Sequence, residues 1–76
     1  MVYLGEAKIL STVKVVDISA KGDLRRRFLD LGIIKGTEIK VLYKSPFGDP
    51  RAYLIRGTVI AIREEEGRKI IVKSTD

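Results

Sequence analysis

Two kinds of side chain are missing from this sequence, and their absence narrows the chemistry open to it. The 76 residues contain no cysteine and no histidine. Without them the chain can form no disulfide and lacks the usual ligands of zinc, copper and haem iron. It also lacks the groups that most often act as base or nucleophile near pH 7. We therefore expect a protein that is not an enzyme, with no catalytic residue, no cofactor and no metal site.

Long apolar runs are missing as well. No stretch approaches the roughly 20 apolar residues of a transmembrane helix, and the longest run, Thr58–Ile62, has the length of a strand. The first residues, Met1–Glu6, lack the basic and long apolar parts of a signal peptide. No P-loop motif is present either, which excludes GTP binding of that kind. These absences predict a cytoplasmic protein.

The charge and apolar content indicate a folded, basic domain. Lysine and arginine number 15 against 10 aspartate and glutamate, for a formal net charge of +5. This excess favours an acidic partner, whether nucleic acid, anionic lipid or an acidic protein face. The hydrophobic share of 45% is that of a chain with a core rather than a basic tail. At this length we expect residues 1–76 to form one domain.

The apolar pattern predicts about five short strands. They are expected at Lys8–Ile18, Thr37–Lys44, Ala52–Arg56, Thr58–Arg63 and Lys69–Lys73. Imperfect alternation near Ser11 and Thr12 predicts a bulge or a bend there, and Met1–Glu6 is expected to be an extended lead-in. In the second strand Ile39, Val41 and Tyr43 alternate on one side, with Leu42 as the exception. Short strands with close turns favour a mainly β fold, a small and partly open barrel.

One short helix is predicted between the first two strands. Leu24, Phe28 and Leu31 recur at helical spacing, Asp23 is expected to cap the start, and Gly32 to end the helix in a left-handed conformation. A helix of about two turns does not persist alone in water. We therefore expect its apolar stripe to dock onto the barrel.

Several segments, in the right order, resemble the FeoA family (ferrous iron transport protein A). The segments are Gly22–Val41, with L-R-R-R-F-L-D-L-G-I-I-K-G, Ser45–Pro50, with S-P-F-G-D-P, Ile55–Arg63, with I-R-G-T-V-I-A-I-R, and Glu66–Val72. Gly67 stands where the family usually has alanine. The resemblance runs from about Val15 to Val72, and Ala7–Thr12 depart from the family's usual beginning.

The resemblance implies an SH3-like barrel and an accessory role in bacterial ferrous iron uptake. The partner would be FeoB, a membrane permease with a cytosolic GTPase domain, and the chain would meet the membrane only through it, as a monomer or weak homo-oligomer. Two alternatives remain open: a metal-regulator domain related to the C-terminal domain of DtxR-type repressors, and a small basic nucleic-acid-binding barrel. Scattered aromatic residues disfavour the second, because base stacking needs an aromatic stripe.

Five residues are the candidates for partner contact. They are Arg25, Arg27, Phe47, Asp49 and Arg56. The arginines can form charge-assisted pairs with an acidic face. Phe47, between two prolines at a loop tip, is interpreted either as an exposed apolar anchor or as a plug over the end of the barrel.

The neighbouring charges have simpler interpretations. Arg26 is expected to face solvent and pair with Asp30 at i+4. The acidic run Glu64–Glu66 is expected to be a solvated turn that pairs with Arg63 and Arg68, because consecutive acids on a turn seldom converge on a cation.

Overall fold

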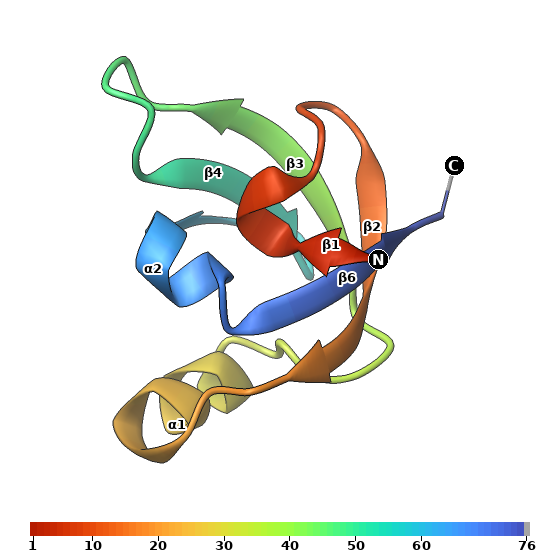
Figure 1. The fold of residues 1–76 in the computed structure, drawn as a ribbon, viewed down its shortest axis with the longest axis vertical. Coiled ribbons are helices and arrows are strands. Elements are labelled where there is room, and N and C mark those ends of the chain that lie inside the picture. Colours follow the sequence, from red (N-terminus) through yellow and green to blue (C-terminus); the bar gives the residue numbers. More distant parts are fainter. Residues whose placement is uncertain (76) are drawn as a thin grey trace.

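The structure, a computed structural model, describes residues 1–75 and is built on a six-stranded antiparallel sheet. The strands are β1 (Val2–Tyr3), β2 (Thr12–Ile18), β3 (Glu38–Lys44), β4 (Arg51–Ile55), β5 (Thr58–Ile62) and β6 (Ile70–Ser74). Their order in the sheet is β1-β6-β2-β3-β4-β5, so β1 and β5 are its edges. The sheet curls into the expected mainly β, partly open barrel (Figure 1).

Residues 1–75 also form three helical segments, which lie between the strands in the sequence. They are a 3₁₀ turn, η1 (Leu4–Glu6), the helix α1 (Gly22–Asp30) and a single turn, α2 (Glu64–Gly67). Figure 1 shows α1 at one end of the molecule and the β3–β4 loop at the opposite end. The two ends therefore offer separate surfaces.

Alternation along the strands builds the core. Every second side chain of a strand points to the same face, and the buried set includes Val13, Val15, Ile39, Val41, Tyr53, Ile55, Ile70 and Val72. Phe28 of α1 is 1% exposed and belongs to this core, with Leu24 and Leu31 partly buried against it. The predicted stripe on a docked helix is confirmed.

Only one end of α1, its C-terminal end, is as predicted from the sequence. Gly32 has the predicted left-handed backbone, with φ +83°. A Cβ at this position would lie 2.4 Å from Cδ of Arg56, so a larger residue would force the Arg56 side chain to move. The prediction that Asp23 caps the start is wrong. The helix begins at Gly22 after Lys21, so Asp23 lies inside the first turn. Its negative charge there stabilises the helix by interacting with the positive end of the helix dipole.

The first long strand is shorter than predicted. It begins at Thr12 rather than Lys8, because the main-chain N–H and hydroxyl of Ser11 both donate to the Lys8 carbonyl, at 3.1 and 2.6 Å, and close a turn. This turn is the bend that was one of the two alternatives near Ser11 and Thr12, and no bulge lies there. The register shifts instead between Val15 and Asp17, where β2 pairs with β6.

A second bulge explains the irregular residue in β3. The register of β3 against β4 shifts between Val41 and Tyr43, so Leu42 is the inserted residue. Ile39 and Val41 are buried, whereas Tyr43 is 57% exposed. The prediction that Tyr43 shares their face is therefore wrong.

The N-terminal segment is more structured than an extended lead-in. Val2 and Tyr3 add a sixth strand beside β6, and Leu4 is fully buried. The guanidinium of Arg51 on β4 donates to the main-chain carbonyls of Gly5 and, at 2.6 Å, Ala7. One arginine thus ties the first turn to a strand that lies far away in the sequence.

Arg51 also lies over Tyr53, with its guanidinium carbon 5.9 Å from the ring centroid. Burial raises the pKa of the Tyr53 hydroxyl, and the charge of Arg51 partly offsets that rise. The tyrosine therefore stays neutral over the physiological range, and the guanidinium remains available to the carbonyls of η1.

Replacing Arg51 by lysine tests this link. A lysine ammonium cannot reach several carbonyls with a planar fork, so we expect Arg51→Lys to lower the free energy of unfolding by about 1–3 kcal/mol. Urea denaturation measures the change. In the control, Arg26→Lys, the side chain is 79% exposed and we expect a change within about 0.5 kcal/mol. Equal stability of the two variants would contradict the role of Arg51.

Candidate protein-docking cleft

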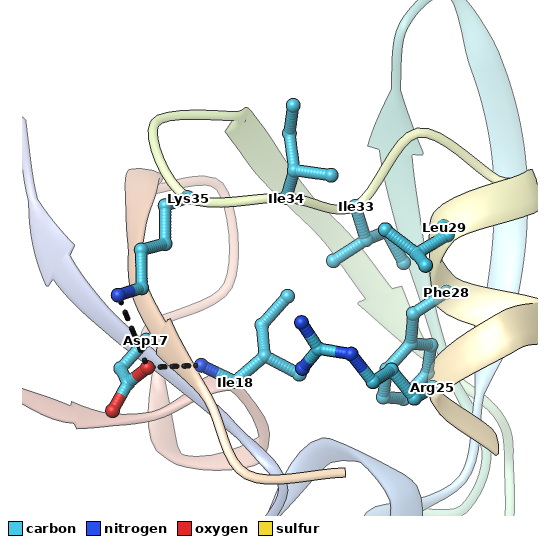
Figure 2. Close-up of a pocket in the computed structure, with 8 residues that line it drawn as sticks. All are labelled: Asp17, Ile18, Arg25, Phe28, Leu29, Ile33, Ile34 and Lys35. Carbon is cyan, nitrogen blue, oxygen red and sulfur yellow. Dashed lines mark hydrogen bonds and ion pairs between the residues drawn. The ribbon is translucent and has the colours of Figure 1, made fainter. Parts of the chain in front are cut away.

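A cleft of about 370 Å³ lies between α1 and the loop that follows it (Figure 2). Its lining residues come from the end of β2, from α1 and from the loop: Asp17, Ile18, Arg25, Phe28, Leu29, Ile33, Ile34 and Lys35. Phe28 and Ile33 are buried, while Leu29 and Ile34 are 47% and 42% exposed. The cleft therefore combines a buried apolar floor with accessible apolar side chains.

The loop wall of the cleft is fixed by hydrogen bonds. The Thr37 hydroxyl donates to the Gly32 carbonyl at 2.9 Å and accepts the Ile34 N–H at 3.1 Å. Two main-chain bonds fasten the loop to β2: Gly36 N–H to the Val15 carbonyl at 2.8 Å, and Val15 N–H to the Thr37 carbonyl at 2.9 Å. Thr37 is only 8% exposed, so this lock is shielded from water and the wall is preformed.

The helix wall is held by the burial of Phe28, by an ion pair to α2 and by hydrogen bonds to the residues after the helix. Phe28 is held in the core, and its carbonyl accepts the Ile33 N–H at 2.9 Å. Arg27 forms an ion pair with Glu66 of α2, and Nε of Arg56 donates to the Gly32 carbonyl at 3.3 Å. These contacts hold α1 at a set distance from the loop.

Some charged side chains at the cleft have a partner and one does not, among residues 1–75. Asp17 lies 3.8 Å from Lys35 and also accepts the Ile18 N–H at 2.9 Å (Figure 2). The Arg25 side chain extends across the cleft toward Ile18 (Figure 2), and its guanidinium has no ion pair or hydrogen bond within residues 1–75. A free guanidinium beside apolar walls suits a carboxylate that arrives with an apolar side chain.

The five candidate contact residues do not form one site. Arg25 lines the cleft, and Arg27 and Arg56 engage Glu66 and Gly32 beside it. Phe47 and Asp49 lie in the β3–β4 loop, at the opposite end of the molecule (Figure 1). Only the arginines are brought together.

The interpretation of Phe47 as a plug is wrong, because its side chain is 96% exposed. The loop closes on itself through Gly48 N–H to the Ser45 carbonyl at 2.8 Å and Ser45 N–H to the Pro50 carbonyl at 3.0 Å. A ring at the tip of such a closed loop has no core within reach. The carboxylate of Asp49 accepts the N–H of Glu64 at 2.9 Å and so supports the start of α2.

The predicted ion pairs of the neighbouring charges are confirmed in part. Arg26 pairs with Asp30 at 3.5 Å, as predicted, and Glu64 pairs with Arg68 at 3.3 Å. Glu66 instead reaches Arg27 of α1. Within residues 1–75, no three acidic side chains gather as metal ligands do, and no helix has the length and apolar character to span a membrane.

Sequence reasoning missed Asp17, Leu29, Ile34 and Lys35 as lining residues. One signal was available: Leu29 and Ile34 are apolar but fall outside the Leu24/Phe28/Leu31 stripe and outside the predicted strands. Apolar residues without a place in the core pattern mark surfaces that a partner can cover.

The sequence of this chain matches that of known proteins. The family model described as the FeoA domain matches residues 2–74. A fusion of Fe(2+) transport protein A with the Fe(2+) transporter FeoB, from Porphyromonas gingivalis, is 32% identical over 59 residues, which cover 78% of this chain and 7% of that protein. The chain therefore spans only a small part of this relative.

Solved structures share the whole fold. A FeoA-like protein from Clostridium acetobutylicum has a TM-score of 0.88 at 39% identity, over 97% of this chain and 86% of that one. FeoA from Stenotrophomonas maltophilia, solved with zinc and described as a procaryotic SH3 domain protein, has 0.83 at 26%, over 96% and 91%. A manganese-dependent transcriptional repressor, at 24% identity, TM-score 0.85 and 95% and 35% coverage, shares the fold alone.

A change at Thr37 tests whether the cleft wall is locked. Thr37→Val keeps the shape but removes the acceptor of the Ile34 N–H and one of the two donors to the Gly32 carbonyl, which keeps Nε of Arg56, so we expect a loss of about 1–3 kcal/mol in the free energy of unfolding. The Ile34 amide should also exchange its hydrogen faster. Thr37→Ser retains the hydroxyl and should retain the protection of that amide. The same protection in both variants would show that the hydroxyl does not hold the wall.

Proposed function

Because this chain belongs to the FeoA family, we propose that it is a non-enzymatic accessory protein of ferrous iron uptake that docks onto the cytosolic region of a FeoB-type permease. The family is linked to Fe²⁺ transport by the fused relative, in which a FeoA part and a FeoB transporter share one polypeptide. Fusion gives two domains a high effective concentration. A separate FeoA chain has to reach the same arrangement through affinity, and this requires a docking surface.

The cleft at α1 is the docking surface that we assign to this role. A partner segment would place an apolar side chain between Leu29 and Ile34 and a carboxylate on Arg25. Lys35 adds a second positive charge, since its pair with Asp17 is largely exposed, with 74% and 56% of the two side chains accessible, and exposed pairs cost little to separate. The contact is small, so binding should be modest and reversible.

The other candidate residues take secondary places in this proposal. Arg27 and Arg56 flank the cleft and would meet acidic groups at its margin. Phe47 would be a separate apolar contact, reached only by a partner that extends to the far end of a molecule measuring 29 × 27 × 23 Å. Asp49 would act by supporting α2 rather than by touching the partner. The proposal places the chain in the cytoplasm, where the soluble part of the permease would be met.

Matched charge reversals on one helix test the docking surface. Arg25→Glu puts a negative charge where the partner's carboxylate would bind, so we expect affinity for the cytosolic region of a FeoB-type permease to fall at least about tenfold, the effect of losing one charge-assisted hydrogen bond. Arg26→Glu makes the same charge change on the side chain that pairs with Asp30 and should alter affinity by less than about twofold. Isothermal titration calorimetry measures both.

The control for folding is thermal unfolding of the two variants, which should stay close to that of the original chain. Among residues 1–75 Arg25 has no ion-pair partner to lose, and the pair of Arg26 with Asp30 is largely exposed, with 79% and 69% of the side chains accessible, so its loss changes stability little. Equal loss of affinity in both variants would indicate a general effect of net charge rather than a contact at the cleft. Unchanged affinity of Arg25→Glu would refute the assignment of the cleft.

A further inference from the structure

Two loop tips at the end of the molecule opposite α1 expose large apolar side chains. One tip is the turn before β2, where Leu10 is 68% exposed, and the other is the β3–β4 loop, where Phe47 is 96% exposed. Figure 1 shows both loops at the same end, away from α1. The N–H of Leu10 donates to the Val41 carbonyl of β3 at 2.6 Å, so the first tip lies beside the strand that leads into the second. The two tips belong to one surface.

The backbone at Leu10 is unfavourable for the residue that occupies it. Its φ of +71° lies in the left-handed region, which glycine and asparagine adopt readily and a leucine adopts only at an energetic cost. The side chain gains little burial in return, because it is largely exposed. Strained residues of this kind gather at functional sites. The turn therefore presents an apolar tip that the fold does not need.

Lysines accompany the apolar tips. Lys8 and Lys44 are exposed and line a hollow of about 450 Å³ between the two loops. Within residues 1–75 their ammonium groups form no ion pair or hydrogen bond. The nearby carboxylates are engaged: those of Glu6 and Asp49 accept main-chain N–H groups, and that of Glu64 forms an ion pair. Unpaired positive charges beside apolar tips complement an anionic surface.

We propose that this end of the molecule docks onto a lipid bilayer with anionic headgroups. Leu10 and Phe47 enter the interfacial region of the bilayer, and the two lysines meet the headgroups, the combination by which peripheral proteins bind anionic membranes. Tyr43 of β3, 57% exposed, adds an amphipathic ring that suits the same region. The proposal goes beyond the expectation that the chain meets the membrane only through a permease.

The shape of the surface favours a bilayer over a protein as the occupant. Both tips protrude, and the hollow between the loops is lined mainly by charged and small residues and by neither tip. A protein would need two separate apolar pockets at matching positions, whereas a bilayer takes in protruding side chains without preformed pockets. Docking at this end leaves the cleft at α1 on the far side (Figure 1), so the proposal does not depend on the role of the cleft.

Cosedimentation of the purified chain with vesicles tests the role of the lysines without any permease. We expect binding to mixed phosphatidylcholine and phosphatidylglycerol vesicles to be at least about tenfold tighter than to phosphatidylcholine alone. Lys8→Gln combined with Lys44→Gln should remove most of this difference. Lys21→Gln combined with Lys69→Gln, which removes the same charge from exposed positions near the start of α1, should retain it. No binding to the mixed vesicles, or equal effects of the two double variants, would overturn the proposal.

The apolar tips are tested with the same mixed vesicles. Phe47→Ser should weaken binding at least about tenfold, because the ring no longer leaves water. Leu10→Asn should weaken it at least about fivefold and raise the thermal unfolding temperature, since asparagine accepts the left-handed backbone. Leu29→Asn makes the same change at the opposite end and should alter binding by less than about twofold.

Three results would overturn the role of the tips. They are unchanged vesicle binding by Phe47→Ser, equal losses of binding in Leu10→Asn and Leu29→Asn, and a lower unfolding temperature of Leu10→Asn. If Phe47→Ser instead weakened only binding to the cytosolic region of a permease, the loop would belong to a protein contact and the bilayer would be refuted as its occupant.

Discussion

The burial of one aromatic ring, Phe28, is the contact on which the cleft depends. A helix of nine residues such as α1 has no stability of its own in water. Its position is set because Phe28, 1% exposed, is held among the side chains of the sheet. Arg25 and Leu29, one helical turn apart, are thereby placed on the cleft. If the ring were not buried, neither residue would have a defined relation to the loop opposite.

Partly buried polar contacts then fix the surroundings of the helix. The hydroxyl of Thr37 bridges the loop, and the guanidinium of Arg51 gathers carbonyls of the first turn. Both use one side chain to satisfy several main-chain groups, which a chain of 76 residues with no disulfide needs. A preformed surface loses little conformational entropy on binding. This is how a small contact area can give useful affinity.

Features governed by local periodicity were predictable from the sequence, and features governed by distant contacts were not. The stripe through Phe28, the left-handed Gly32 and the main strands follow from residue spacing. The link from Arg51 to the first turn spans more than forty residues and leaves no local pattern. Arg25, which was a candidate contact residue because of its charge, lies in the lining of the cleft. Leu29 and its neighbours across the cleft were missed, because the fold alone brings the end of β2 beside α1.

The most direct test of the account is to map where the partner touches the protein. Amide chemical shifts of the ¹⁵N-labelled chain would be followed while the cytosolic region of a FeoB-type permease is added. The account predicts that the shifts change along Arg25–Leu29 and Ile33–Lys35, while those of the loop around Phe47 stay in place. Changes confined to that loop, or no changes at saturating partner, would contradict it.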